Sequence, residues 1–198
     1  MLYSYARERL LGLNRGEGLF MFALNQSVVY PGYGVARVNN IIERSVGAHV
    51  EHFYELKFLH KEMTILVPVD SLSSVGLRPL SHSVCVDMVF KLLADSLLVG
   101  VCAEGVVVNW NKRNKKYQAL LRSGDLVEIS KIYRDLQHLA RTKDLSFGER
   151  ALLAQTEILL AEEIAMISHA LPEHIIAQMR SLCGCRSSAS GKQSESLL

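Results

Sequence analysis

The chain has 198 residues, 49% of them apolar and 21% charged, with a formal net charge of +2. This composition suits one or two globular domains, and so small a net charge does not by itself indicate a nucleic-acid partner. No apolar run reaches the roughly 18 residues that a membrane span needs. Residues 1–20 lack the continuous apolar core of a signal peptide. The four cysteines have no zinc-ligand spacing, so we expect no metal site, no structural disulfide and a cytoplasmic protein.

Short β-strands are predicted for residues 21–80. Residues 27–30 are rich in β-branched and aromatic side chains, and the Pro31-Gly32-Tyr33-Gly34 segment that follows is typical of a turn. A second strand is expected over 35–46, with a turn at Gly47. Residues 52–58 alternate in character, which places Tyr54, Leu56 and Phe58 on one face of a strand.

Two more short strands are expected over 63–67, ended by Pro68, and over 75–80. Strands of this length and spacing predict a small antiparallel β-barrel of the SH3 or Tudor type. The three histidines in this part of the chain have no nucleophile or pair of carboxylates beside them, so we expect no enzymatic activity and no cofactor. They are His49, His52 and His60.

A helical domain is predicted for residues 84–182. An apolar helix over 84–98 is followed by a loop or hinge over 99–108, and another helix is expected over 126–140. The inner face of this second helix would consist of apolar side chains at helical spacing, namely Leu126, Ile129, Tyr133, Leu136 and Ala140.

The end of the helical domain has a clear start signal and a clear break. Ser146 and Glu149 form a capping box, which predicts a helix that runs to about His169. Pro172 breaks this helix, and a last short helix is expected to end near Leu182. The Ser-rich residues 183–198 are expected to be disordered.

Positive charge is concentrated between Trp110 and Lys143. This segment holds nine cations and three acids, a net charge of +6. If a helix starts at about Asn111, one of its faces is basic and continues two turns further on. The cations of this face are Lys112, Lys115, Lys116 and Arg122. Such a face suits a phosphate backbone.

The predicted helix over 126–140 carries a second basic face. Lys131, Arg134, His138 and Arg141 fall at i, i+3, i+7 and i+10. Such a face is ordinarily only solvated. Two successive helices with basic faces nevertheless favour a nucleic-acid surface.

The only tryptophan, Trp110, has two possible environments. If the helix includes Trp110, the indole lies on the side of Tyr117 and Leu121 and packs on a core. If Asn111 caps the helix instead, Trp110 precedes it and is exposed, where a large aromatic could contact a base step. The residues alone leave both possibilities open.

Seven fragments in order resemble the CarD/CdnL family of bacterial transcription regulators that bind RNA polymerase, over residues 21–183. They are VVYPGYGV at 28–35, ILVP at 65–68, SVGLR at 74–78, NWNKR at 109–113, SGD at 123–125, RDL at 134–136 and DLSFGER at 144–150. Each fragment is weak alone, but their order along one chain is a strong signal. Residues 1–20 depart from the family pattern, because family chains normally begin near Met21.

This resemblance implies a Tudor-like RNA polymerase interaction domain followed by a compact helical domain that contacts promoter DNA. The implied protein is a non-catalytic factor without a small-molecule substrate, docked on the polymerase β subunit. In the family, the tryptophan that matches Trp110 wedges into the minor groove at the upstream edge of the transcription bubble and stabilises the open complex. The resemblance therefore implies an exposed Trp110, and its DNA-binding neighbours would include Arg113.

Carried over residue by residue, the polymerase-contacting edge maps to Arg44, Thr64, Leu66 and Pro68. Some family members have arginine where Thr64 or Leu66 stands here, so we expect a more apolar contact in this chain, with strand pairing as its mode. The alternative is a Tudor-like module that binds RNA or a modified peptide in a cage of aromatics such as Tyr30, Tyr33 and Phe53.

Overall fold

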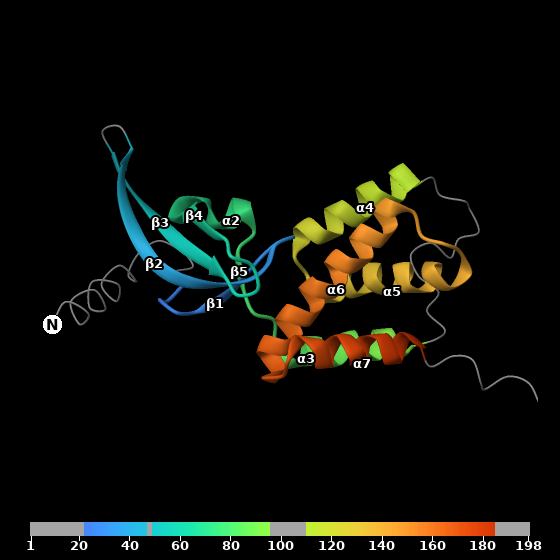
Figure 1. Cartoon of the computed structure of the whole chain (residues 1–198). Coiled ribbons are helices and arrows are strands. Elements are labelled where there is room, and N and C mark those ends of the chain that lie inside the picture. Colours follow the sequence, from blue (N-terminus) through green and yellow to red (C-terminus); the bar gives the residue numbers. More distant parts are fainter. Residues whose placement is uncertain (1–21, 47–48, 96–109, 185–198) are drawn as a thin grey trace, which may run out of the picture.

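The computed structural model describes residues 22–46, 49–95 and 110–184, with an antiparallel sheet followed by a group of helices (Figure 1). The strands are β1 (Ser27–Tyr30), β2 (Gly34–Val46), β3 (His49–Phe58), β4 (Thr64–Pro68) and β5 (Arg78–Pro79). Their order is β4-β3-β2-β1-β5, so β4 and β5 are the edges of this sheet. The expected turn at Gly47, the loop over 99–108, residues 1–20 and residues 185–198 lie outside the described residues.

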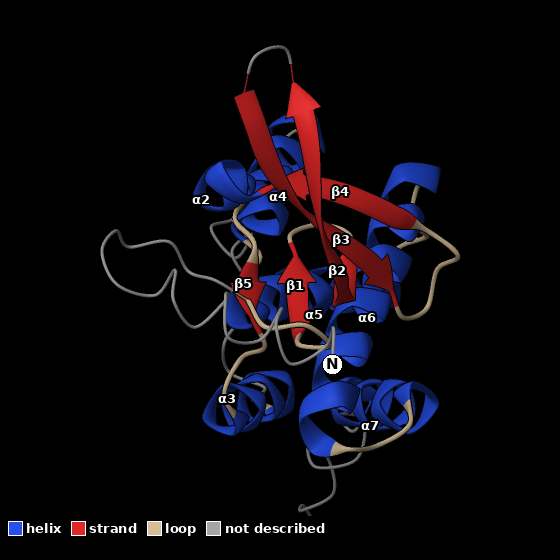
Figure 2. Cartoon of the chain, turned by 90° about the vertical axis from the view of Figure 1, so that its left-hand side faces the viewer, coloured by secondary structure: helices blue, strands red, loops and turns tan. Residues whose placement is uncertain are grey.

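The core of the sheet domain follows from the alternation in β3. Tyr54, Leu56 and Phe58 lie on one face, as predicted, and all three are buried. They pack with Val38 of the adjacent strand β2 and with Val28 of β1. The hydroxyl of Tyr54 accepts a hydrogen bond of 3.0 Å from the backbone N–H of Phe22. Strands β2 and β3 extend beyond the other strands of the sheet, in the direction away from α3 and α7 (Figure 2).

The prediction of a strand over 75–80 is wrong for most of that stretch. A 3₁₀ turn, η1 (Val69–Ser71), and a short helix, α2 (Leu72–Val75), come first. Gly76 ends α2 in the left-handed conformation with φ 76°, a common way to stop a helix. Only the two residues of β5 are then left to pair with β1.

The helices are α3 (Ser83–Ala94), α4 (Trp110–Ser123), α5 (Leu126–Thr142), α6 (Phe147–Ser168) and α7 (Pro172–Gly184). The capping box is confirmed: the Ser146 hydroxyl accepts from the Glu149 N–H, and the Glu149 carboxylate accepts from the Ser146 N–H at 2.9 Å. Asp125 caps α5 by accepting a hydrogen bond of 2.9 Å from the N–H of Glu128.

Two expectations about the helical domain need correction. Ala140 is exposed, whereas the other four predicted inner residues of α5 are buried, because the last turn of the helix extends past the core. Helix α7 ends at Gly184, and Cys183 is buried in the helical core. Residue 183 therefore belongs to the folded domain and not to a disordered tail.

The two parts of the chain meet at the turn between β1 and β2. Gly34 has a φ of 106°, and a Cβ placed on it would lie 2.1 Å from Oε2 of Glu162 in α6. This oxygen accepts a hydrogen bond of 3.3 Å from the N–H of Val35. Only glycine allows this close approach. The Pro-Gly-Tyr-Gly segment is thus a turn, as predicted, and it also anchors the sheet to α6.

Candidate functional site

Helix α4 presents a face of cations to solvent. Lys112, Lys115, Lys116 and Arg122 are exposed, and none of the ion pairs within the described parts of the chain involves them. Tyr117 and Leu121 are buried on the other side of the helix. We call these four cations the basic face of α4. Because their charges are not neutralised by neighbouring acids, they can bind an anionic partner.

Trp110 agrees with the first of the two sequence interpretations in its placement, but it is less buried than a core residue. Helix α4 begins at Trp110 itself, so the indole lies on the inner side, yet it is only half-buried against the edge of the helical core. A Cβ placed on Gly148, at the start of α6, would lie 3.1 Å from Cζ2 of the indole. Trp110 is therefore neither a fully exposed wedge nor a core residue: one side of the ring is anchored.

Arg113 contributes to this anchoring. Its guanidinium lies over the Trp110 ring, 5.5 Å from the centroid, and forms an ion pair with Glu149. The Arg113 side chain is only 14% exposed. A phosphate contact by this residue would therefore compete with an ion pair that already exists within the protein.

Glu149 connects three segments of the chain. Its almost fully buried carboxylate accepts hydrogen bonds from Arg113 in α4, from Lys143 at 3.2 Å and from the backbone of Ser146. Burial opposes ionisation of this carboxyl. The hydrogen bonds from Ser146 and the charge of Lys143 outweigh that effect and lower its pKa. Glu149 is thus an ionised group that holds the first turns of α4 and α6 together.

The predicted basic face of α5 is only partly available. Lys131 forms an ion pair with Glu128, and Arg134 is half-buried and donates to the carbonyl of Leu92 in α3 at 3.4 Å. His138 and Arg141 are exposed. Two of the four residues are therefore engaged by neighbouring groups of the protein.

Sequence reasoning missed Phe147 and the role of Glu149. The Phe147 side chain is 82% exposed at the start of α6, directly before the glycine that contacts the indole. The signal was available for Phe147, because a capping box at Ser146 fixes the next residue at the first helical position. The pairing of Glu149 with Arg113 joins residues 36 positions apart, and no local pattern encodes it.

The second surface is the outer face of the sheet beside edge strand β4. The register pairs Phe53 of β3 with both Ile42 and Pro68, Glu55 with Leu66, and Arg44 with Glu51. Paired residues point to the same side of a sheet. The four predicted polymerase-contacting residues consequently share one face, which also includes half-buried Ile42 and Phe53.

The aromatic cage of the alternative does not form. Tyr30, Tyr33 and Phe58 are neighbours, with the two tyrosine centroids 5.2 Å apart. Phe53, however, is five positions from Phe58 along β3 and lies on the opposite face. Lys61 also extends over the Tyr33 ring, with Nζ 6.0 Å from its centroid.

Within the described residues, no group of three or more histidine, cysteine, aspartate or glutamate side chains is arranged to hold a metal ion. None of the helices in these residues is long and apolar enough to cross a membrane.

Comparisons with known proteins match both parts of the chain. Residues 22–81 match the family model described as CarD-like/TRCF RID domain, and residues 102–180 match the model described as CarD, C-terminal domain. The chain is also 22% identical over 151 residues to the protein named "Putative transcription factor YdeB" of Bacillus subtilis (strain 168). That match covers 74% of this chain and 92% of the other protein.

Replacing Glu149 by glutamine is expected to reduce the free energy of unfolding at pH 7 by about 1–3 kcal/mol, because Arg113 and Lys143 lose a charged acceptor. The lowered pKa sets the pH dependence. Stabilisation by the carboxylate is complete above its unfolded pKa of about 4.3 and is lost as the pH falls through the lower folded value. Chemical denaturation at pH 7 and at acid pH measures the free energy of unfolding of wild type and variant.

The control is Glu128→Gln, at a half-exposed ion pair, which should change the free energy of unfolding only a little. An equal difference between wild type and Glu149→Gln at all pH values would contradict the assignment.

Proposed function

The chain belongs to the CarD/CdnL family of bacterial RNA polymerase-binding transcription regulators, and from this premise we propose that it stabilises the open promoter complex. In this proposal the sheet domain binds the polymerase β subunit. The helical domain contacts promoter DNA at the upstream edge of the transcription bubble. The sheet domain is Tudor-like, and its match to the RID model implies an interaction with RNA polymerase.

The observation that carries the DNA part of the proposal is the basic face of α4 with Trp110 at its N-terminal end. Four unpaired cations on one helix can neutralise phosphates along a strand, which fixes position without reading sequence. The indole is held by contacts with Gly148 and Arg113, so its remaining surface is presented in a defined orientation. A preset aromatic loses little conformational entropy when it binds.

At the bubble edge the indole would fill the gap left by an unstacked base step. Apolar side chains in the minor groove act in this way, at a cost of a few kcal/mol per unstacked step. Exposed Phe147 beside Gly148 would add apolar surface to the same contact. A factor that slows bubble collapse also slows promoter escape. Activation or repression then depends on which step limits a given promoter.

For the polymerase part, the support is the outer face of the sheet at β4. An edge strand has unpaired backbone groups that can pair with a strand of a partner. Leu66 and Pro68 are half-buried and apolar, and Arg44 and Thr64 are exposed around them. An apolar centre with a polar rim is the usual composition of a protein interface.

Trp110→Ala is expected to shorten the lifetime of the open complex without loss of polymerase binding. Because the ring is half-buried, the substitution should also cost about 1–2 kcal/mol of stability, less than the 3–5 kcal/mol of a core tryptophan. Trp110→Phe should keep part of the lifetime. Leu120→Ala is the matched control, since Leu120 is a partly buried residue of the same helix on the same core. If Leu120→Ala shortens the lifetime as much as Trp110→Ala, the effect is one of stability and the wedge is refuted.

Replacing Lys112, Lys115 and Lys116 by alanine is expected to weaken DNA binding and to flatten its salt dependence. Each lost phosphate contact lowers the slope of log K against log salt by about 0.9, so the triple variant should lose up to about 3. Binding to a forked promoter duplex at several salt concentrations measures the slope. Lys91→Ala, an exposed lysine on α3, should leave the slope unchanged. An unaltered slope in the triple variant would mean that the basic face of α4 is only solvated.

Leu66→Glu is expected to abolish binding to β-subunit fragments, because it places a charge in the apolar centre of the proposed interface. Folding should be retained, as measured by circular dichroism. The control is Val50→Glu, since Val50 is 63% exposed on β3 and lies on the opposite face. Undiminished pull-down by folded Leu66→Glu would reject this edge as the polymerase contact.

A further inference from the structure

Arg78 joins the sheet to the helical domain through a bidentate ion pair. Its two terminal nitrogens donate to the two carboxylate oxygens of Glu163 in α6, at 2.7 and 2.8 Å. The Glu163 side chain is only 3% exposed, and the Arg78 side chain 22%. A parallel pair of charged hydrogen bonds fixes orientation as well as distance, because both groups are planar.

Glu163 also holds the segment that connects the two domains. Only three residues separate β5 from α3, and the middle one is Ser81. The N–H and the hydroxyl of Ser81 both donate to Oε1 of Glu163, at 3.0 and 2.7 Å. One buried carboxylate thus binds the last strand of the sheet and the connection at the same time.

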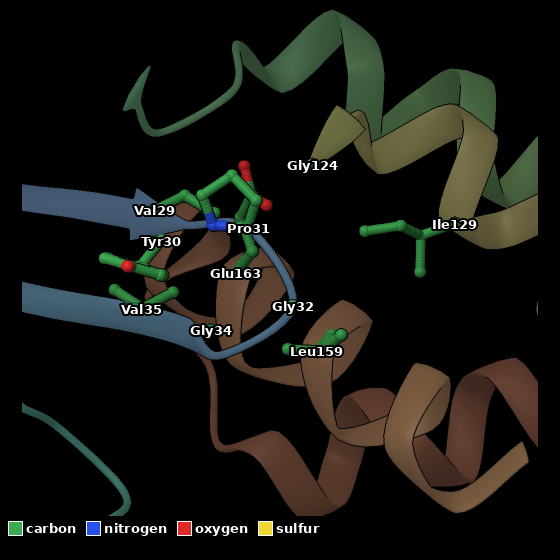
Figure 3. Close-up of a pocket in the computed structure, with 10 residues that line it drawn as sticks. All are labelled: Val29, Tyr30, Pro31, Gly32, Gly34, Val35, Gly124, Ile129, Leu159 and Glu163. Atoms are coloured by element: carbon green, nitrogen blue, oxygen red, sulfur yellow. The ribbon is translucent and has the colours of Figure 1, made fainter. Parts of the chain in front are cut away.

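The same arginine reaches the end of the helix that carries Trp110. Nε of Arg78 donates to the carbonyl of Gly124 at 2.9 Å, and Gly124 follows the last residue of α4. Gly124 has a φ of 67°, and a Cβ placed on it would lie 3.1 Å from Cγ of Pro31. Figure 3 shows Pro31, in the turn after β1, close to Gly124 and to helix α6, which carries Glu163.

These contacts restrain α4 at both of its ends. The C-terminal end is held against the sheet through Gly124, and the N-terminal end is held to α6 through Arg113 and Glu149. Breaking a buried ion pair is costly, because the remaining charge has no partner. The sheet and α4 therefore have one preferred relative orientation.

We propose that Glu163 is a positioning residue: through Arg78, Ser81 and Gly124 it sets the orientation of the DNA-contacting helices relative to the polymerase-binding sheet. This inference rests on the proposed function. Each domain can bind its own partner without Glu163. The lengthening of the open-complex lifetime requires both contacts at once, so it depends on a fixed distance between the outer face of the sheet and Trp110.

The test uses full-length Glu163→Gln, which retains the size of the side chain and removes its charge. Residual dipolar couplings measure domain orientation directly. We expect the couplings of the sheet and of the helices to fit one common alignment in wild type and to require two in the variant. The variant should still bind β-subunit fragments and forked DNA with wild-type affinity, and it should lose the lengthening of the open-complex lifetime.

Two further variants separate positioning from stability. Glu157→Gln removes another carboxylate of α6 that also binds an arginine, Arg180. Both partners of that ion pair belong to the helical domain. It should keep one alignment and the full lifetime. Arg78→Lys keeps the positive charge but cannot form the bidentate ion pair, so this variant should behave as Glu163→Gln does.

The proposal is overturned if Glu163→Gln keeps a single alignment. It is also overturned if the domains become independent and the lifetime is still lengthened as in wild type, or if Glu157→Gln shows the same losses. Failure of the proposed function has a different signature. In that case wild type itself does not lengthen the lifetime, while the dipolar couplings still decide whether Glu163 sets the orientation.

Discussion

Burial of carboxylates along α6 is the constraint on which the rest of the structure depends. Glu149, Glu157, Glu162 and Glu163 are all buried in this one helix. A buried carboxylate is unfavourable unless hydrogen bonds or cations replace its water. Each of the four accepts hydrogen bonds from a different part of the chain. Glu149 accepts from α4 and Ser146, and Glu157 accepts from Tyr133 and α7. Glu162 accepts from β2, and Glu163 accepts from β5 and Ser81. Apolar packing tolerates small shifts, but these contacts are directional. Helix α6 therefore determines where its neighbours lie as well as how tightly they pack.

The two proposed contacts are linked by this helix. Glu149 lies at its first turn and pairs with Arg113, which lies over the Trp110 ring, and Glu163 lies fourteen residues further on, against the sheet. At 1.5 Å per residue, about 20 Å of helix separates the two carboxylates. A helix packed on several sides is a stiff spacer. When the sheet domain binds the polymerase, a rigid connection holds the indole at one position relative to the DNA. A flexible connection would let the indole occupy many positions.

Features encoded locally were predictable from the sequence. The alternation of Tyr54, Leu56 and Phe58 and the capping box at Ser146 both depend on neighbours within a few residues, and both are confirmed. No local pattern indicates partners for the other acids of α6, and the family resemblance implied a DNA contact for Arg113. Their partners are distant in sequence: Arg78 and Glu163 are 85 positions apart. Only the packed fold shows that these charges neutralise each other, so the sequence alone does not tell which cations are already paired within the protein.

The half-burial of Trp110 follows from the same long-range pairing. The segments around Trp110 and Gly148 read as separate family motifs, yet they form one contact in which the indole lies against a residue without a side chain. Any Cβ at Gly148 would press on the ring, and loss of Glu149 would remove the ion pair that holds Arg113 over the ring. A tryptophan on a free helix end would sample several rotamers, and ordering them would oppose insertion into DNA. Here that ordering occurs when the protein folds. The stability of the helical domain and the proposed insertion of Trp110 into DNA thus depend on the same contacts. A change in the segment around Gly148 would therefore also affect the segment around Trp110.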